Sequence, residues 1–388
     1  MTGWEHADLS RMGEAAAQAL RRQDHRTARP LFEKLAVARP DDISVWYGLA
    51  LACRGLGDDA AQLAALDRVL AADPRHIPAL LMKADQFARS GDGRAAHTFY
   101  KTVVARAASA QALPPDLRAE VARAERECAR YAREYERHLL NALEHAGFDP
   151  RSSSPRFTQS LDLLLGKKQI YLQSPTSFYF PELPQRQFYE RHEFAWLPAF
   201  EAHTDVIAGE LLEVLGDDAA FRPYMLAQPN RPPGVFADLA DSVDWAAFFL
   251  IEGGSLVETA AARCPRTMAA LAGVPLTDAP GRTPSVLFSR LRPGVRIPPH
   301  TGQINARLIC HLPLIVPPGC GLRVGNEVRH WARGETLIFD DSIEHEAWNH
   351  SDTTRVVLLF EIWRPELSEE ERILVAAALA AVGSFNEA

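Results

Sequence analysis

Two histidines and an arginine in the C-terminal half of the chain have neighbours that suggest chemistry. His300 follows Pro298-Pro299 and precedes Thr301-Gly302, a pattern that predicts a rigid turn at the end of a strand. His345 comes 45 residues later, just after an apolar run, and Arg355 follows after 10 more residues. Imidazole is a good ligand for transition metals, and the planar guanidinium group matches a carboxylate. The residue types therefore indicate a metal site beside an anion site.

The composition is that of an ordinary globular protein. The chain has 388 residues, of which 47% are hydrophobic and 24% charged, and this length predicts two or three domains. A net charge of −8 without a basic block argues against nucleic acid as a partner. Five cysteines, an odd and small number, fit a reducing compartment. With no readable secretory signal and no stretch near 18 apolar residues, we expect a cytoplasmic protein without a membrane span.

A repeat with a period of 34 residues marks the N-terminal part. Gln23-Asp24, Gly57-Asp58 and Gly91-Asp92 recur at that step. Apolar positions follow the same step: Phe32, Leu66 and Tyr100, then Leu35, Val69 and Val103. The pattern resembles the tetratricopeptide repeat, with about three units in residues 9–108. One helical hairpin cannot bury its apolar face alone, so neighbouring units are expected to stack.

We expect three regions along the chain. Residues 1–112 form the tetratricopeptide-like repeats, and residues 113–150 form a connecting or capping helix that opens at Pro114-Pro115. A polar break at 149–155 predicts the boundary to the third region, residues 151–388.

Short β-type runs separated by Pro and Gly dominate from residue 286 onwards. The expected strands are 245–250, 286–288, 308–312, 314–316, 321–324, 336–339 and 356–362. Many short strands with such turns predict a sandwich or a barrel. Helices are expected at 203–215 and, after a capping box between Ser368 and Glu371, as far as Val382.

The spacing of His300, His345 and Arg355, and the sequence around them, resemble those of a known enzyme family. A histidine, a second about 45 residues later and an arginine about 10 beyond is the order of double-stranded β-helix, 2-oxoglutarate-dependent oxygenases. The run from 300 to 367, which begins HTGQINARLICHLPL and ends EIWRPEL, closely resembles the aspartyl/asparaginyl β-hydroxylase family. The match is looser over 170–299. The implied fold is multi-domain: all-α tetratricopeptide-like repeats, then a β-rich double-stranded β-helix (jelly-roll, cupin-like) domain with flanking helices.

The resemblance implies a cosubstrate site built around iron. His300 and His345 would be the catalytic residues, binding Fe(II) with no further protein ligand. Arg355 would hold the far carboxylate of 2-oxoglutarate, with Ser289 beside it. His311 would contact the cosubstrate near its metal-binding end.

A strand through 307–311 would position the substrate side of the same site. Side chains alternate along a strand, so Arg307, Ile309 and His311 share one face, which should point into the barrel. Arg307 would bind the substrate. Ile309 stands where the family usually has an arginine that helps to hold an acidic group, so the preference for an aspartyl or asparaginyl side chain is open.

Gly302 and four nearby acids set the surroundings of the expected metal. Most relatives in the wider superfamily carry a carboxylate ligand at the position of Gly302, and glycine there is the family's own signature. The vacant position would be open to water or an anion. The acids Asp340, Asp341, Glu344 and Glu346 either orient a metal-bound water or form a solvated turn at a strand end.

We therefore expect an oxidoreductase, a 2-oxoglutarate-dependent dioxygenase that uses Fe(II), 2-oxoglutarate and O₂. It would hydroxylate an unactivated carbon, the β-carbon of an Asp- or Asn-like residue in a peptide or protein. The repeats would offer a concave groove for that substrate. Three alternatives remain open: an oxygenase acting on a lipid or small metabolite, a halogenase that uses the vacant position, and a non-catalytic repeat scaffold with a degenerate barrel.

Overall fold

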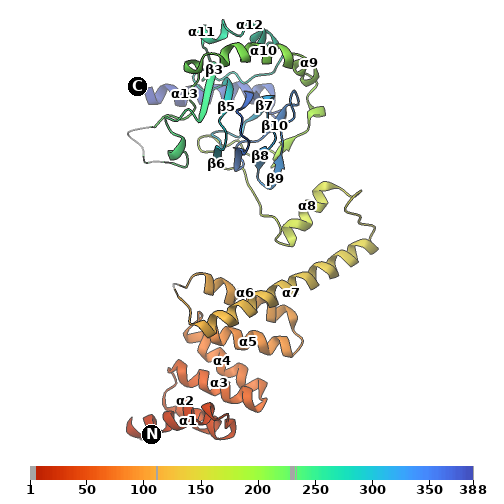
Figure 1. Cartoon of the computed structure of the whole chain (residues 1–388). Helices are drawn as coiled ribbons and strands as arrows, with labels where there is room; N and C mark the ends of the chain where they lie inside the picture. The colour runs from red at the N-terminus through yellow and green to blue at the C-terminus, as the bar shows by residue number, and fades with distance from the viewer. Residues whose placement is uncertain (1–5, 111, 228–231, 233, 388) are drawn as a thin grey trace. The chain divides into compact units, whose positions relative to one another are not determined.

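The computed structural model of the chain divides into two compact units (Figure 1). Unit 1 is Met1–Leu165 and unit 2 is Gly166–Ala388. The structure describes residues 6–110, 112–227, 232 and 234–387. The sequence placed the boundary in the polar segment 149–155, whereas the break in contacts follows a further short helix, α8 (Pro155–Leu164). Phe157 of α8 packs against Phe148, with ring centroids 5.4 Å apart, so the polar segment is a turn within unit 1.

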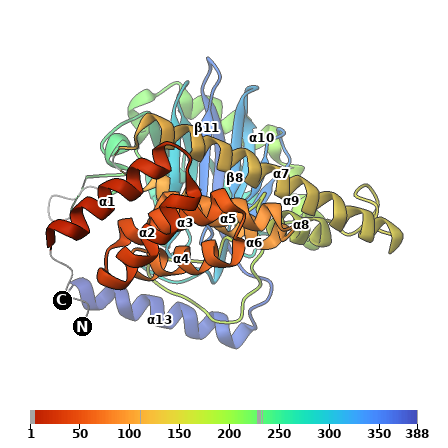
Figure 2. The same cartoon turned by 90° about the horizontal axis from the view of Figure 1, so that it is seen from below.

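Unit 1 is a stack of helical hairpins. Its remaining helices are α1 (His6–Arg21), α2 (His25–Ala38), α3 (Ile43–Leu56), α4 (Asp59–Ala72), α5 (Ile77–Arg89), α6 (Gly93–Ala108) and α7 (Pro115–His145). Helices α1 and α2, α3 and α4, and α5 and α6 lie side by side (Figures 1 and 2). This arrangement confirms the predicted helical repeats.

The 34-residue step has a simple cause in the turn of each hairpin. Asp24, Asp58 and Asp92 are the N-caps of α2, α4 and α6, and each side chain accepts the backbone N–H three residues later. The residue before each aspartate has a positive φ, between 58° and 82°. Glycine adopts this conformation without strain, and it fills the position in two of the three units.

Unit 2 is β-rich with flanking helices. Its strands are β1 (Phe188–Tyr189), β2 (Arg222–Pro223), β3 (Trp245–Glu252), β4 (Ser255–Leu256), β5 (Val286–Leu291), β6 (Arg296–His300), β7 (Arg307–Ile315), β8 (Cys320–Val324), β9 (Glu327–Arg329), β10 (Leu337–Phe339), β11 (His345–Asn349) and β12 (Arg355–Trp363). Its helices are α9 (Leu197–Glu201), α10 (Thr204–Leu215), α11 (Glu258–Ala261), α12 (Pro265–Leu271) and α13 (Glu369–Glu387), with 3₁₀ turns at Arg191–Glu193, Asp218–Ala220 and Ala237–Leu239. None of the described helices is long and apolar enough to cross a membrane.

The strands form two sheets between which the chain passes repeatedly. The larger sheet has the order β1-β10-β7-β12-β5-β3-β2, with β4 beside β3, and the smaller has the order β6-β11-β8-β9. From β5 to β12 the chain alternates between them: β5, β7, β10 and β12 lie in the larger sheet, and β6, β8, β9 and β11 in the smaller. This connectivity is compatible with the expected double-stranded β-helix.

The larger sheet separates two apolar layers. On its outer face, one set of side chains from β7 and β12 packs under helices α9, α10 and α12: Leu308, Cys310, Leu312, Leu314, Val356, Leu358, Phe360 and Ile362. The residues between them, such as Ile309 and Val357, face a second layer with Leu322 and Val324 of the smaller sheet. The predicted alternation along β7 is therefore confirmed, and the inner layer is where a site can be built.

The details of four elements differ from the sequence analysis. Residues 308–312 and 314–316 were expected as two strands, but β7 is continuous because a register shift on β12 accommodates Pro313. Only the end of β6 at His300 was expected, and β11 was not expected. The prolines of β6 are tolerated because β6 is an edge strand, where a missing N–H costs no ladder hydrogen bond. Helix α13 has the predicted capping box of Ser368 and Glu371 but continues beyond Val382.

Candidate active site

The two predicted metal ligands meet across one pair of strands. Strands β6 and β11 are antiparallel, and His345 is the direct cross-strand partner of His300. Their ring centroids are 4.0 Å apart. His345 is buried and His300 is half-buried. Residues far apart in sequence are thus placed side by side by the register of a single ladder.

Both rings are held with the same nitrogen free. The Nδ1 of His300 lies 2.8 Å from the carbonyl oxygen of Pro298, and that of His345 lies 3.1 Å from the carbonyl oxygen of Ile343. A carbonyl only accepts, so Nδ1 carries the proton and the lone pair is on Nε2. Burial lowers the pKa of His300, and that of His345 falls well below its usual range. Neutral imidazoles are the form that binds metals, so the pair fits a divalent cation.

The loop before β11 is anchored by a buried ion pair. Asp340 and Arg364 are both fully buried, with 2.7 Å between the carboxylate and the guanidinium group. Asp340 also accepts hydrogen bonds from the Gln173 side chain and from the backbone N–H and hydroxyl of Ser342. These contacts fix the chain that leads into His345. Asp340 is therefore not part of a solvated turn.

Asp341 occupies the space beside Gly302. The Gly302 N–H donates to the carbonyl oxygen of Asp341 at 2.7 Å, and a Cβ at residue 302 would overlap the Asp341 carboxylate. That carboxylate lies 3.1 Å from the Arg307 guanidinium. Burial raises its pKa, whereas the charges of Arg307 and His300 oppose the rise. An acid from another loop thus fills the place of a side chain at residue 302.

The two remaining acids near His345 are engaged elsewhere. Glu346 is the next residue along β11, so it points to the opposite face from His345. Glu344 and Glu346 both pair with Arg323, which is the cross-strand partner of Glu346 on β8. Of the four candidate acids, Asp341 is the one that interacts with the histidine pair.

The inner face of β7 and β12 arranges the other predicted residues in a row. On β12 the inward positions run from Arg355 at one end to Glu361 at the other. On β7, His311 lies opposite Leu359, and Ile309 lies opposite Glu361. Successive inward positions are about 7 Å apart along a strand. Arg355 and Arg307 therefore lie at opposite ends of this inward-facing row.

Arg355 is a buried cation without an anionic partner in the described part of the chain. Its side chain is 1% exposed, and burial lowers its pKa to about 10. Its closest polar contacts are the backbone and hydroxyl oxygens of Ser289, at 3.4 and 3.5 Å from Nη1, and Nε has no partner. The nearby His311 also has an unpartnered Nδ1, and burial together with Arg355 lowers its pKa to about 3. A cation buried in this way is compensated when an anion binds beside it.

Arg307, at the other end, is already compensated. Its guanidinium lies 3.1 Å from Asp341 and 3.4 Å from Glu361, and all three side chains are buried. Burial raises the pKa of both carboxyl groups, and Arg307 opposes the rise. Even with one carboxyl protonated, the cluster has no net positive charge. The neighbouring inward residue, Ile309, adds an apolar surface.

The structure brings all six predicted residues to the inner faces of the two sheets, and adds others that the sequence did not single out. Trp331 lies under Arg355 with its ring centroid 4.9 Å from Cζ. Phe236 packs edge-on against His300, with centroids 4.8 Å apart. Nothing in the local sequence marks either residue, because each reaches the cavity from a connection between strands.

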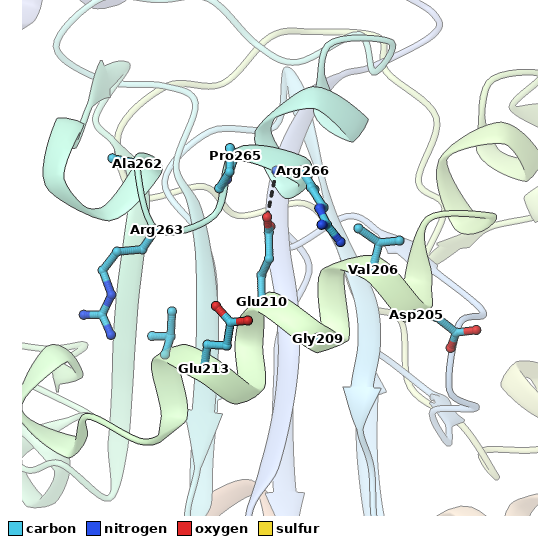
Figure 3. Close-up of a pocket in the computed structure, with 10 residues that line it drawn as sticks. Asp205, Val206, Gly209, Glu210, Glu213, Ala262, Arg263, Pro265 and Arg266 are labelled. Atoms are coloured by element: carbon cyan, nitrogen blue, oxygen red, sulfur yellow. Dashed lines mark hydrogen bonds between the residues drawn. The ribbon is translucent and has the colours of Figure 1, made fainter.

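The large hollow on the helical side of unit 2 is separate from this cavity. It has a volume of about 810 Å³ and lies between α10 and the segment that joins α11 to α12 (Figure 3). Glu210 projects from α10 and accepts hydrogen bonds from Arg266 N–H and from Thr267, so it caps α12. Arg263 pairs with Asp217. These charges have structural partners, and none of the six predicted residues lines the hollow.

Part of unit 2 matches a known protein family. Residues 201–365 match the family described as Aspartyl/Asparaginyl beta-hydroxylase. The resemblance found in the sequence is thereby confirmed. Within the described ranges, no cluster of three or more His, Cys, Asp and Glu side chains could hold a metal, and the predicted iron site has two histidines.

Two curated relatives illustrate the match to the hydroxylase domain. The human aspartyl/asparaginyl beta-hydroxylase is 36% identical over 152 residues, which is 38% of this chain and 20% of that protein. The ornithine lipid ester-linked acyl 2-hydroxylase of Rhizobium tropici is 38% identical over 188 residues, covering 46% of this chain and 60% of that protein. The chain thus spans between a fifth and three fifths of the length of these relatives.

Solved structures similar to the chain cover about a third of it. PcrH from Pseudomonas aeruginosa aligns over 33% of this chain and 95% of its own, with 19% identity and a TM-score of 0.30. The TPR2B domain of yeast Sti1 covers 32% of this chain, with 12% identity and a TM-score of 0.29. The assignment of the repeats rests on the capped hairpins of unit 1 described above.

A methyl group at residue 302 should destabilise the hydroxylase domain. Gly302→Ala places Cβ in the space of the Asp341 carboxylate, so we expect the free energy of unfolding to fall by about 1–3 kcal/mol. Gly209→Ala is the matched control, because it lies in an exposed helical position with open space around it and should be neutral or stabilising by about 0.5–1 kcal/mol. Urea denaturation measures both. Equal stability of Gly302→Ala and the wild type would contradict the packing described.

Acidification should destabilise the metal-free protein below the ordinary histidine pKa. Burial lowers the pKa of His300, His311 and His345 in the folded protein. Below about pH 6.5 these histidines therefore bind protons in the unfolded chain but not in the folded one. Each group lowers stability by up to about 1.4 kcal/mol per pH unit as the pH falls, and for His311 this continues to about pH 3. Thermal melting between pH 7.5 and 5 measures the slope. His311→Gln should flatten it and the exposed His350→Ala should not; a melting temperature independent of pH would refute the expectation.

Proposed function

We propose that this chain is an Fe(II)- and 2-oxoglutarate-dependent dioxygenase that hydroxylates an unactivated carbon. The observation that carries the proposal is the pair of neutral histidines with free Nε2 atoms on β6 and β11, together with Arg355 on β12, a buried cation with no carboxylate in contact among the described residues. The hydroxylases among the relatives support the reaction class. Five free cysteines fit the cytoplasm that we propose as its location.

The residues present fit this metal and cosubstrate. His300 and His345 would hold the iron through Nε2, and Arg355 would hold the distal carboxylate of 2-oxoglutarate. When bound, the iron and 2-oxoglutarate would supply the oxidation. One oxygen atom of O₂ would enter the substrate as a hydroxyl group, and the other would enter succinate as CO₂ is lost. Two neutral imidazoles, a divalent cation and a dianion sum to no net charge. No observation favours the alternative of a halogenase, which would bind a halide ion at the position beside Gly302.

The protein side chains have distinct tasks around that centre. Ser289, at 3.5 Å from the Arg355 guanidinium, completes the carboxylate site. His311, neutral because of its burial, presents a hydrogen-bonding nitrogen along the same wall. Asp341 accepts from Arg307 and, as the acid beside Gly302, is placed to orient a water on the open side of the metal. Phe236, packed against the edge of His300, excludes bulk water.

The charge pattern indicates what kind of group the substrate brings. Arg307 is neutralised by Asp341 and Glu361, and Ile309 offers no charge. A carboxylate bound there would lack a free cation, whereas an amide needs only hydrogen bonds. We therefore favour the β-carbon of an asparagine-like residue over that of an aspartate. The helical repeats of unit 1 would hold the flanking peptide or protein.

An acyl chain is the second candidate substrate. The apolar side chain of Ile309 lies on the inner wall between Arg307 and His311, where an aliphatic carbon would make favourable contacts. The relative from Rhizobium tropici is described as an acyl 2-hydroxylase of ornithine lipid. A scaffold without catalysis is disfavoured by the intact histidine pair and Arg355.

Removing one metal ligand should abolish turnover. His345→Ala leaves a single imidazole for the iron, so we expect consumption of 2-oxoglutarate with Fe(II) and O₂ to fall to background. His350→Ala, which removes an exposed histidine outside the cavity, should match the wild type. Succinate formation and the affinity for Fe(II) under anaerobic conditions are the two measurements. Unchanged turnover and metal affinity in His345→Ala would refute the iron assignment.

Substrates that differ only in charge should separate the candidate classes. A peptide with asparagine should be hydroxylated at least about tenfold faster than its aspartate counterpart at pH 7, because an unpaired buried carboxylate costs more than about 1.4 kcal/mol. Mass spectrometry of the products, which gain one oxygen atom, measures both rates. A faster aspartate peptide would contradict the charge balance at Arg307. Turnover of an acyl amide with neither peptide modified would establish the second candidate.

A further inference from the structure

Trp331 differs from the other buried tryptophans of unit 2 in its hydrogen bonding. Trp245 Nε1–H donates to the Ser289 hydroxyl at 3.4 Å, and Trp363 Nε1–H donates to Asp278 at 2.9 Å. Trp331 is 7% exposed, and its buried Nε1 has no acceptor in the described structure. A buried donor without a partner is costly and calls for an explanation, such as a ligand that the site is built to receive.

The surroundings of Trp331 identify the ligand chemistry. The guanidinium carbon of Arg355 lies 4.9 Å from the centre of its ring, and the ring of His311 is 6.0 Å away, centroid to centroid. Arg355 Nε and His311 Nδ1 are also buried and unpartnered. The unpartnered nitrogens of Trp331 and Arg355 therefore belong to side chains in direct contact, and the ring of His311 lies beside them. A carboxylate has two oxygens that accept several hydrogen bonds and carries the charge that Arg355 lacks.

We propose that Trp331 binds the distal carboxylate of 2-oxoglutarate. Its indole N–H would donate a hydrogen bond to the carboxylate that Arg355 holds. The inference rests on the proposed function and extends it to a residue outside the predicted set. An indole N–H lies in the plane of its ring, so one side chain can do two things. Its face supports the guanidinium through a cation–π contact, and its edge donates to the carboxylate. Trp331 thereby fixes the direction of Arg355 as well as adding a donor.

The experiment separates the N–H group from the ring. Trp331→Phe keeps an aromatic face under Arg355 but removes the donor, and Trp363→Phe is the matched control because its lost N–H bonds Asp278 instead. Calorimetry under anaerobic conditions, with Zn²⁺ as a redox-silent metal, measures the affinity for 2-oxoglutarate. A second ligand, 2-oxobutyrate, has the same metal-binding end but no distal carboxylate.

We expect Trp331→Phe to bind 2-oxoglutarate about tenfold more weakly than the wild type and to bind 2-oxobutyrate equally well. Trp363→Phe should bind both as the wild type does. In the absence of ligand, we expect Trp363→Phe, and not Trp331→Phe, to be the more strongly affected variant. Both variants shrink a ring by the same volume, but only Trp363→Phe loses a satisfied hydrogen bond, so its melting temperature should fall further.

The outcomes distinguish this inference from the proposed function. Wild-type affinity for 2-oxoglutarate in Trp331→Phe, or an equal loss for 2-oxobutyrate, would overturn the role of Trp331 while leaving the dioxygenase intact. Failure of the wild type to bind 2-oxoglutarate with metal present would overturn both. If Trp331→Phe folds poorly, Trp331→His, which restores a ring N–H, should recover part of the selectivity for 2-oxoglutarate; no recovery in a folded Trp331→His would also count against the inference.

Discussion

The antiparallel register of β6 and β11 is the constraint on which the site depends. It places His345 opposite His300, and the backbone carbonyls of Pro298 and Ile343 then orient both rings in the same way. A shift by one residue would send one histidine to the outer face of the sheet. The anchoring of the preceding loop by Asp340 and Arg364 serves this register, because it fixes where β11 begins.

Charge is distributed unequally between the two ends of the cavity. Arg355 is buried with no carboxylate in contact, whereas Arg307 has two. An uncompensated buried cation destabilises the free protein, and the cost is recovered when an anion binds. One arginine is therefore left without a carboxylate, and the other contacts Asp341. The proposed function assigns the first to a dianionic cosubstrate and the second to the side of an uncharged substrate group.

Gly302 and Asp341 show how a small residue can be required by a larger one. The backbone of Gly302 donates to the carbonyl of Asp341, and the side chain of Asp341 fills the space that a Cβ would need. An acid therefore remains close to the histidine pair, but it arrives from the loop before β11 and is held by Arg307. Its position beside the histidine pair is set by tertiary packing, so the proposed iron would meet this acid through a water and not as a direct ligand.

The residue pattern by itself determined much of this protein. Turn chemistry and apolar spacing predicted the repeats, because the capping of α2, α4 and α6 by aspartate is a local interaction. Side-chain alternation placed Arg307, Ile309 and His311 on one face, and the candidate site residues followed from a family resemblance. Only the tertiary structure decided that Arg307 is compensated, that Arg355 is not, and that the N–H of Trp331 has no partner. Those facts depend on the pairing of distant strands and on burial, and neither is encoded in short-range spacing.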